Sequence, residues 1–475
     1  METLQRTANR GSISTGNYEI GNSVKLESDN GERFLAADPF QDYDSVRIFT
    51  RSLWVKRSEI TNHQQLIADF SVNTNVTITL QFDATDHLKY FVENSGDKIN
   101  LITNRLFRDM SAWYHIFLVV DTTQGTAANR VKIYVNGVQE TSFATEVYPT
   151  QNLDLPFQTR TYMFGYDGGN NGFCGYATEF HALDGIAAAP TDFGEFDDDS
   201  GIWIPIEYEG NYGTEGYYLN FSDSANMGKD HGPNAFGNAF ADPSAITAAD
   251  QTPDTPTNNF CTFNPLVRVH NNPTFSDGAM KVTGGGGTFN QAFGTIGVSS
   301  GKWYFEVKVL DASDTGYFGL STHPAIPDSV SGGQLMYNTS FIVGAASGID
   351  YYYWSGGSQT SDENTGWGNL ANGNVLGFAI DLDASTRTCK IFRNNSALSG
   401  NKANPFDLTA NMQTGFLFPM YVQYEQNLDV WRFGAYTENT PDSVATDANG
   451  YGNFEYAPPS GFYAICTKNL AEYGG

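Results

Sequence analysis

The chain has 475 residues and a formal net charge of −27, because 53 Asp and Glu outweigh 26 Lys and Arg. A chain of this length exceeds what one compact core normally supports, so two or three domains are expected. The negative charge repels phosphate backbones and anionic lipid surfaces, which argues against nucleic acid as a ligand. Abundant Phe, Tyr and Gly with only 17% charged residues indicate an all-β protein.

Residues 1–17 are polar, rich in Gly, Ser and Thr, and without periodicity. Such a segment is typical of a flexible arm or an attachment segment. It has no apolar stretch of the kind found in signal peptides, and the chain has no run of about 18 apolar residues. We therefore expect synthesis in a cytoplasm and no membrane insertion.

Short strand candidates follow one another over residues 18–241, which we take as the first domain. Residues 76–82 show the clearest alternation, with Val76, Ile78, Leu80 and Phe82 on one face and Thr and Gln on the other. This period of two predicts a half-buried strand. The domain should be an antiparallel sandwich, with an acidic loop after Pro190 and closing strands after that loop.

Residues 242–262 are polar and contain Pro243, Pro253 and Pro256. We expect a Pro-rich linker there. The strand pattern returns over residues 263–475, where the run Trp303–Val309 again alternates apolar and polar side chains. The sequence therefore predicts a second antiparallel sandwich after the linker.

One local pattern occurs in both halves: an apolar strand, an Asp, a polar loop, an Arg and a second strand that ends in an Asn-containing turn. Asp121 and Arg130 belong to the first copy and Asp381 and Arg387 to the second. Turn residues of this kind hold hairpins together. We expect both Asp/Arg pairs to stabilise turns and not to form functional sites.

The second half resembles a SPRY domain, through residues 300–309, 316–321, 375–395 and 416–422. The first half resembles the laminin-G-like branch of the concanavalin A-like sandwiches, through residues 52–58, 111–123 and 129–139. Both resemblances imply jelly-roll sandwiches, concanavalin A-like first and SPRY-like second.

The two domains together, with the joint and the C-terminal segment, resemble structural proteins of tailed bacteriophages. The resemblance implies a non-enzymatic, fibre-type protein of the virion surface that binds host-surface glycan or protein. It also implies attachment to other virion proteins through residues 1–17 and assembly as a homo-oligomer, by default a trimer. The alternatives are a purely structural capsid or tail decoration protein and, less expected, a polysaccharide-degrading glycosidase.

Catalytic motifs are weak. Glu195, Asp197 and Ser200 approach a Glu-x-Asp-x-x-Glu glycosidase pattern, but the last carboxylate is missing. Residues 297–301 match G-x-S-x-G on paper, although a strand, not a helix, should follow them. Thr283–Thr288 is Gly-rich but lacks the Lys of a phosphate-binding loop. No catalytic residue is predicted.

No cofactor or metal is predicted either. The seven histidines form no pair at helical spacing, and the four cysteines are widely separated. Calcium is the one open possibility, with oxygens from Asp197, Asp198 and Asp199 or from Asp381 and Asp383. Solvated acidic turns explain these residues equally well.

A glycan site is the remaining hypothesis. Aromatic rings stack on sugar faces while Asp and Asn bind hydroxyl groups. The candidate ligand-binding residues are Asp350, Tyr352, Trp354 and Trp367. The alternative is that a strand through this region buries two or three of these rings in the core.

Overall fold

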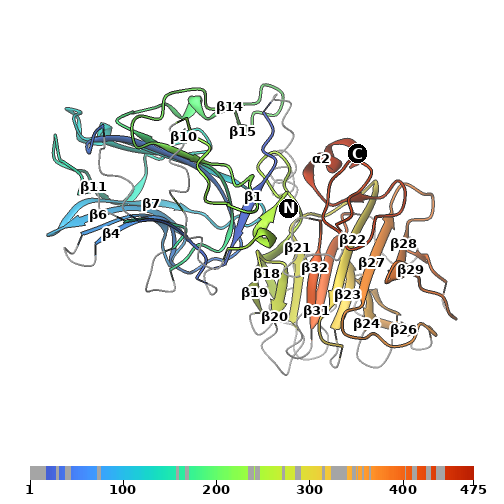
Figure 1. Cartoon of the computed structure of the whole chain (residues 1–475). Helices are drawn as coiled ribbons and strands as arrows, with labels where there is room; N and C mark the ends of the chain where they lie inside the picture. The colour runs from blue at the N-terminus through green and yellow to red at the C-terminus, as the bar shows by residue number, and fades with distance from the viewer. Residues whose placement is uncertain are drawn as a thin grey trace. The chain divides into compact units, whose positions relative to one another are not determined.

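The computed structural model describes residues 18–27, 31–37, 44–71, 76–156, 160–165, 171–233, 240, 246–269, 273–283, 290–312, 316–322, 340–344, 349, 351–355, 358–362, 365–401, 403–408, 415–423, 429–434 and 444–474. The chain divides into two compact units, with the boundary between Thr257 and Asn258. We call them the first unit and the second unit. Both consist of mainly antiparallel sheets, which confirms the all-β prediction (Figure 1).

The first unit is a sandwich of two large sheets. Sheet 1 has the order β10 (Val138–Gln139), β9 (Val131–Val135), β8 (Tyr114–Asp121), β3 (Ile48–Arg57), β13 (Gly175–Asp184), β1 (Ser23–Leu26) and β17 (Gln251–Thr252), with β16 (Tyr217–Leu219) also paired to β13. Sheet 2 has the order β11 (Phe143–Val147), β7 (Asp97–Leu106), β6 (His87–Asn94), β5 (Val76–Phe82), β4 (Gln64–Ser71), β12 (Arg160–Met163) and β2 (Phe34–Ala37).

Alternating side chains fill the space between these sheets. On β5, Ile78, Leu80 and Phe82 are buried in the main core, as the sequence predicts. On β3, Phe49 and Leu53 point into the same core, while Ser52 and Trp54 must point to the outer face of sheet 1. Each sheet thus has one dry face, and its outer face is free for a different use.

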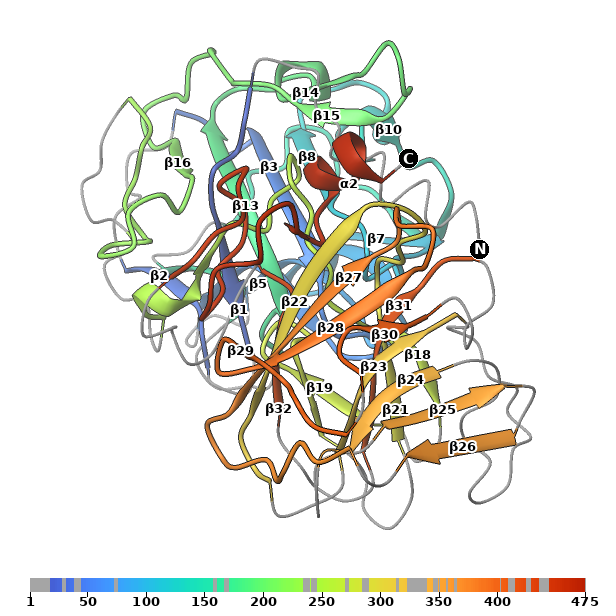
Figure 2. The same cartoon turned by 90° about the vertical axis from the view of Figure 1, so that its right-hand side faces the viewer.

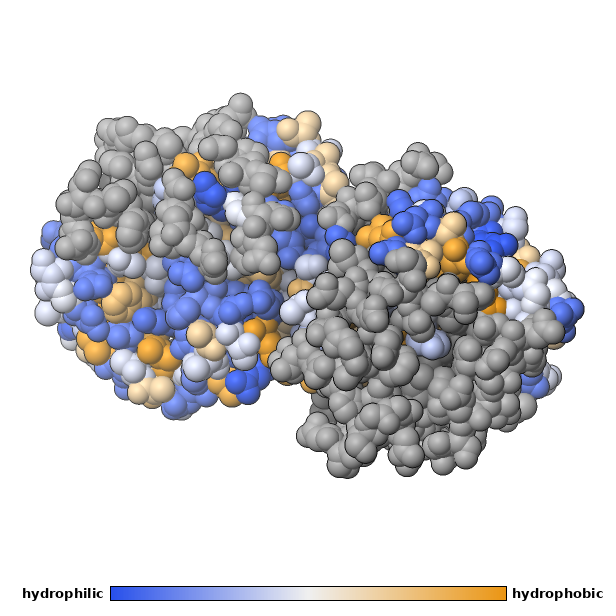
Figure 3. Space-filling model, turned by 90° about the horizontal axis from the view of Figure 1, so that it is seen from below, coloured by the Kyte–Doolittle hydropathy of each residue, from blue (hydrophilic) through white to orange (hydrophobic). Residues whose placement is uncertain are grey.

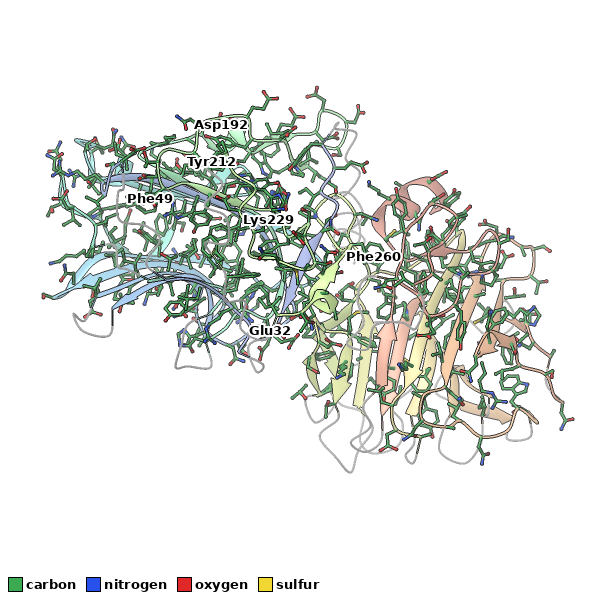
Figure 4. All side chains as sticks on the ribbon, in the orientation of Figure 1. Glu32, Phe49, Asp192, Tyr212, Lys229 and Phe260 are labelled. Atoms are coloured by element: carbon green, nitrogen blue, oxygen red, sulfur yellow. The ribbon has the colours of Figure 1, made fainter. Side chains whose placement is uncertain are left out.

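A separate hairpin lies outside the sandwich. It consists of β14 (Gly194–Phe196) and β15 (Trp203–Pro205), preceded by the 3-10 turn Pro190–Asp192. Residues 190–212, which we call the flap, bury Trp203, Phe193 and Tyr212 against the outer face of sheet 1. In Figure 4, Tyr212 and Asp192 lie above the sheet that carries Phe49. The sequence predicts two closing strands after the acidic loop. Residues 216–221 include β16, which pairs with β13 of sheet 1, whereas residues 202–208 include β15 and belong to the flap.

Residues 246–257 differ from the expected linker. They include the 3-10 turn Ala248–Asp250 and β17, which pairs with β1. Asp250 contacts Lys25 at 3.2 Å and Asp254 contacts Lys56 at 2.7 Å, all four side chains being buried. The sequence suggested a linker because prolines and acids rarely build a core. Here the acids neutralise lysines that sheet 1 buries.

The chain passes from one unit to the next without a loose stretch. Thr257 Oγ1 bonds both the backbone N–H and the backbone oxygen of Ile20, each at 3.2 Å, within the first unit. Two residues later, the backbone N–H of Asn259 donates to Thr467 Oγ1 in the second unit, at 2.9 Å. The boundary is therefore confined to the bonds around Asn258.

The second unit also has two large sheets. Sheet 3 has the order β18 (Phe263–Val269), β21 (Asn290–Gly294), β31 (Phe418–Gln423), β23 (Gly316–Ser321), β24 (Ser340–Gly344), β25 (Tyr351–Ser355) and β26 (Ser358–Asp362). Sheet 4 has the order β19 (Thr274–Ser276), β20 (Lys281–Thr283), β32 (Asp429–Arg432), β22 (Lys302–Val309), β27 (Val375–Asp381), β28 (Thr388–Arg393) and β29 (Ser396–Ala397), and β30 (Phe406–Asp407) and β33 (Tyr463–Ala464) pair with β28 and β22.

Figure 2 shows β22, β27 and β28 side by side, with the short helix α2 (Thr467–Tyr473) near one end of β22. Trp303, Phe305, Val307 and Val309 on β22 are buried in the core of this unit, as predicted for the apolar face of the strand. Tyr304 and Glu306 on the other face are buried too, so the prediction that this face meets water is wrong.

The repeated hairpins are β8–β9 and β27–β28, and their Asp residues hold turns as predicted. Asp121 Oδ1 accepts from the Thr123 N–H and hydroxyl, at 3.0 and 2.6 Å. Arg130 donates to the backbone oxygens of Gln124, Gly125 and Pro149. Asp381 Oδ1 accepts from the N–H groups of Asp383 and Ala384.

Candidate binding face

A stack of three rings seals the centre of sheet 1's outer face. The His115 imidazole lies between Trp54, with ring centroids 4.9 Å apart, and Trp203 of the flap, at 5.9 Å. Trp203 fits because its neighbours are glycines: a Cβ on Gly137 or Gly194 would lie 2.3 or 2.5 Å from its ring. The Asn136-Gly137 turn therefore closes a hairpin and also makes room for the flap.

Ser52 and His115 form a pair that looks like a catalytic dyad. Ser52 Oγ lies 2.8 Å from His115 Nε2, the distance expected between a nucleophile and its base. However, Trp203 Nε1–H donates to His115 Nδ1 at 2.9 Å, so the neutral ring carries its proton on Nε2. That nitrogen then donates to Ser52 and cannot take its proton.

Burial reinforces this conclusion. The complete enclosure of His115 lowers its pKa to about 3, with a further contribution from His181. Ser52 is also almost fully buried, so no substrate reaches its hydroxyl group. The pair is structural.

A second polar cluster surrounds Glu179. Its carboxylate accepts from the phenol groups of Tyr18, at 2.6 Å, and Tyr218, at 2.7 Å. His181 Nε2 lies 3.5 Å from the carboxylate, and its ring stacks on Tyr218 at 4.3 Å. Burial and the nearby Glu179 charge raise the pKa of both phenols, which keeps them protonated as donors.

The Glu179 cluster holds the chain in place. Glu179 has φ +51° at a β-bulge between Thr178 and His181, and this bulge turns its side chain toward Tyr18. Both carboxylate oxygens already accept a phenol, so the cluster anchors the segment that begins at Tyr18. Sequence reasoning missed it because Tyr18, Glu179 and Tyr218 are about 160 and 40 residues apart, and no local pattern links them.

The outer face of sheet 2 has a different character. Ala68, Thr79, Phe91 and Asn100 form one row across β4 to β7, since each lies opposite the next in the strand register. Gln65, Gln81, Lys89 and Ile102 form the adjacent row. This side of the first unit is mainly hydrophilic, with separate hydrophobic spots (Figure 3).

The two rows differ in accessibility along their length. Gln65, Thr79 and Gln81 are buried, whereas Lys89, Phe91, Asn100 and Ile102 are half-buried. Lys89 Nζ lies 4.2 Å from the Phe91 ring centroid, in a cation–π contact. An aromatic ring, an ammonium donor and several amides are therefore grouped on one face of the sheet, which suits a polyhydroxyl ligand.

Among the predicted glycan residues, Trp367 is the one whose side chain the structure describes. Asp350 lies outside the described residues, and for Tyr352 and Trp354 only the strand β25 is described, not the side chains. Trp367 is 2% exposed and packs edge-on against Phe406, with centroids 5.1 Å apart. Because core packing covers its ring, Trp367 offers no face for a sugar to stack on.

Two of the other candidate motifs are turns, and residues 284–288 of the Gly-rich motif lie outside the described residues. Asp197 Oδ1 accepts from the Ser200 N–H and hydroxyl, which makes the acidic run a capped turn. The 297–301 motif precedes β22, and its Ser300 hydroxyl donates to the backbone oxygen of Gly474. Within the described ranges, no group of three or more His, Cys, Asp or Glu residues is placed to hold a metal. The same part of the chain contains no helix that could span a membrane.

Residues 29–185 match the sequence profile of the concanavalin A-like lectin/glucanases superfamily. This range lies inside the first unit and covers less than half of the chain. Over these residues the first unit is therefore similar to that superfamily. No curated protein matches the chain.

Among solved structures, the SPRY domain of human HERC1 is similar at 15% identity and a TM-score of 0.27, covering 36% of this chain and 96% of that one. Domain 4 of AbnA, a GH43 extracellular arabinanase from Geobacillus stearothermophilus in complex with arabinotriose, matches at 19% identity and 0.27, covering 36% and 75%. The carbohydrate-binding module CBM66 from Bacillus subtilis matches at 10% and 0.24, covering 36% and 91%. At these scores the likenesses carry no argument about function.

Proposed function

We propose that this chain is a non-enzymatic binding protein whose first unit binds glycan through the outer face of sheet 2. One observation carries the proposal: the two outer faces of the sandwich are used differently. The flap seals the face of sheet 1, while the face of sheet 2 keeps half-buried polar and aromatic side chains at its β6–β7 end. A lectin-like fold with one such face is suited to binding a polyhydroxyl surface.

The biological setting we propose is the surface of a bacteriophage virion, where the protein acts as a fibre-type component that contacts the host. Support comes from the resemblance of the domain combination to phage structural proteins. Residues 1–17 would attach it to other virion proteins, and assembly as a homotrimer is part of this proposal. The net charge of −27 repels nucleic acid, so the proposed ligand is a glycan or a protein of the host surface.

The direct test is binding of the intact protein to a glycan array and to host-derived polysaccharide. Lys89→Met should weaken binding about tenfold, because it removes the cation beside Phe91. Lys132→Met is the matched control, since Lys132 is a half-buried lysine on β9 of the other sheet. Equal binding by both variants would place the ligand elsewhere.

Two other outcomes would replace the proposal. Release of reducing sugar from a bound polysaccharide would make the chain a glycosidase. The protein would instead be a decoration protein if cryo-EM of virions showed both units lying flat on the capsid and if the protein bound no glycan.

A further inference from the structure

Two acceptor oxygens on the outer face of sheet 2 have no hydrogen-bond partner among the residues that the structure describes. They are Gln65 Oε1 and Asn100 Oδ1, and both atoms are shielded from solvent. The Gln65 side chain belongs to a residue only 7% exposed. A shielded acceptor without a donor lowers stability, so such atoms are rare in folded proteins. Both lie on one face of one sheet, where a hydroxyl group of a ligand could supply the missing donor.

The strand register fixes which way these side chains point. Gln65 lies opposite Gln81. Its neighbour Gln64 lies opposite Phe82 and faces the core, where it accepts from Arg57 Nε at 2.8 Å. Asn100 lies between Ile99 and Leu101, which are both core residues. Successive side chains alternate, so Gln65 and Asn100 both point to the outer face. The Gln65 amide turns about a broad torsion, which lets its oxygen meet a ligand. The Asn100 nitrogen donates to Asp97 Oδ2 at 3.0 Å, so the Asn100 oxygen is the end of that amide left for a ligand.

The distance between the two acceptors decides the size of the ligand. They lie on β4 and β7, three strand spacings apart, and one row apart along the strands. At about 4.8 Å per strand and 6.6 Å per row, the separation is about 16 Å. One sugar ring cannot reach both atoms. An extended ligand that crosses β5 and β6 can, and it would pass over Gln81, Lys89 and Phe91.

The chemistry of the two atoms decides the ligand class. Both are acceptors, so the ligand must bring donors to both ends of the face. Hydroxyl groups donate, whereas an ionised carboxylate only accepts. The net charge of −27 also disfavours a polyanion.

We propose that this face binds a linear neutral oligosaccharide laid across β4 to β7, with hydroxyl groups donating to Gln65 at one end and Asn100 at the other. This inference rests on the proposed glycan-binding function and names the ligand's length and class.

The test uses the full chain and gluco-oligosaccharides of one to six units with different linkages, with binding measured by calorimetry. Affinity should rise steeply once the ligand is long enough to span both residues. Gln65→Met and Asn100→Leu keep side-chain size and remove the acceptor. Each variant should bind the long oligomers about fivefold more weakly than the intact protein. The shortest sugars reach at most one of the two residues, so at most one of the two variants should bind them more weakly.

Stability provides a second readout. Removing a buried, unpartnered acceptor should leave the unfolding midpoint of Gln65→Met unchanged or higher, which shows that the variant folds. Gln81→Met is a comparison on the same row, because the Gln81 amide already has His63 within 3.4 Å.

The possible failures are distinct. If intact protein binds glycan but affinity does not depend on length, or both variants bind long oligomers normally, this inference is wrong and the proposed function stands. The same holds if only acidic glycans bind. If the intact protein binds no glycan at all, the proposed function falls and this inference falls with it.

Discussion

Lys56 Nζ lies 2.7 Å from Asp254 Oδ2, and neither side chain is exposed to solvent by more than 1%. Trp113 Nε1 donates to the other oxygen of Asp254 at 3.0 Å. Removing one partner of a buried ion pair leaves an uncompensated charge, which typically costs about 3–5 kcal/mol. We expect Asp254→Leu to lower the free energy of unfolding of the first unit by this amount, measured by urea denaturation.

The surface pair Arg47–Asp154 is the control, because its side chains are 41% and 64% exposed. Asp154→Leu should cost less than about 1 kcal/mol. The double variant Lys56→Met/Asp254→Leu should recover most of the stability lost in Asp254→Leu, since it removes both charges. A double variant as unstable as the single one would show that the lost contacts, not the unpaired lysine, dominate.

His115 should make the first unit acid-sensitive. Its pKa is about 3 in the folded protein, because burial disfavours the charged ring, against about 6.5 in the unfolded chain. Between these values the unfolded state binds more protons than the folded one. Stability is therefore complete above about pH 6.5 and falls as the pH drops toward 3, by up to about 1.4 kcal/mol per pH unit.

Urea denaturation of intact protein and His115→Gln at pH 7, 6, 5 and 4 measures this effect. The variant should be less stable at pH 7 but lose less stability on acidification. His63, which is exposed, gives the control His63→Gln, whose pH dependence should match that of the intact chain. Parallel curves for all three proteins would rule out His115 as the source.

Gly137 should tolerate no side chain. It has φ +75°, and a Cβ there would lie 2.3 Å from a Trp203 ring carbon. Gly137→Ala combines backbone strain with a clash, so a loss on the order of 3 kcal/mol is expected. Gly125→Ala in the preceding loop is the control, since a Cβ on Gly125 would meet no described atom within 4 Å and its φ is ordinary.

Trp203 fluorescence checks the same prediction at the flap. If Gly137→Ala displaces the flap, the emission of the buried Trp203 shifts to longer wavelength, whereas Gly125→Ala leaves it unchanged. A Gly137→Ala protein with normal stability and emission would contradict the close approach.

Tyr18→Phe tests the Glu179 cluster. The variant loses one donor to a buried carboxylate, and hydrogen bonds to charged groups contribute about 1.5–3 kcal/mol. Tyr148→Phe is the matched control, because Tyr148 also donates to a carboxylate, that of Glu146, but at an exposed site. Hydrogen exchange of the β1 amides should accelerate in Tyr18→Phe and not in Tyr148→Phe.

The sequence predicted the architecture better than the sites. Period-two runs such as residues 76–82 and 303–309 mark strands because one face of each is dry, and the Asp121 and Asp381 turns follow from local chemistry. Local patterns carry such information directly. The flap, in contrast, depends on Trp203 meeting His115 and Gly137 of the β8–β9 hairpin, which lies far from Trp203 along the chain.

The candidate sites show the same limit. Trp367 resembles a loop aromatic in the sequence, and only the position of Phe406 shows that it is buried. Gln65 and Asn100 look like ordinary polar residues on strands. Their lack of partners within the described part of the chain is visible only when the neighbouring strands are in place, so no sequence pattern could have identified them.

The tight boundary at Asn258 affects how the protein can be dissected. Thr257, Asn258 and Asn259 are buried and hydrogen-bonded on both sides of the boundary. A recombinant first unit that stops at residue 245 would lack both carboxylates that neutralise Lys25 and Lys56. Fragments for binding studies should therefore end at Thr257.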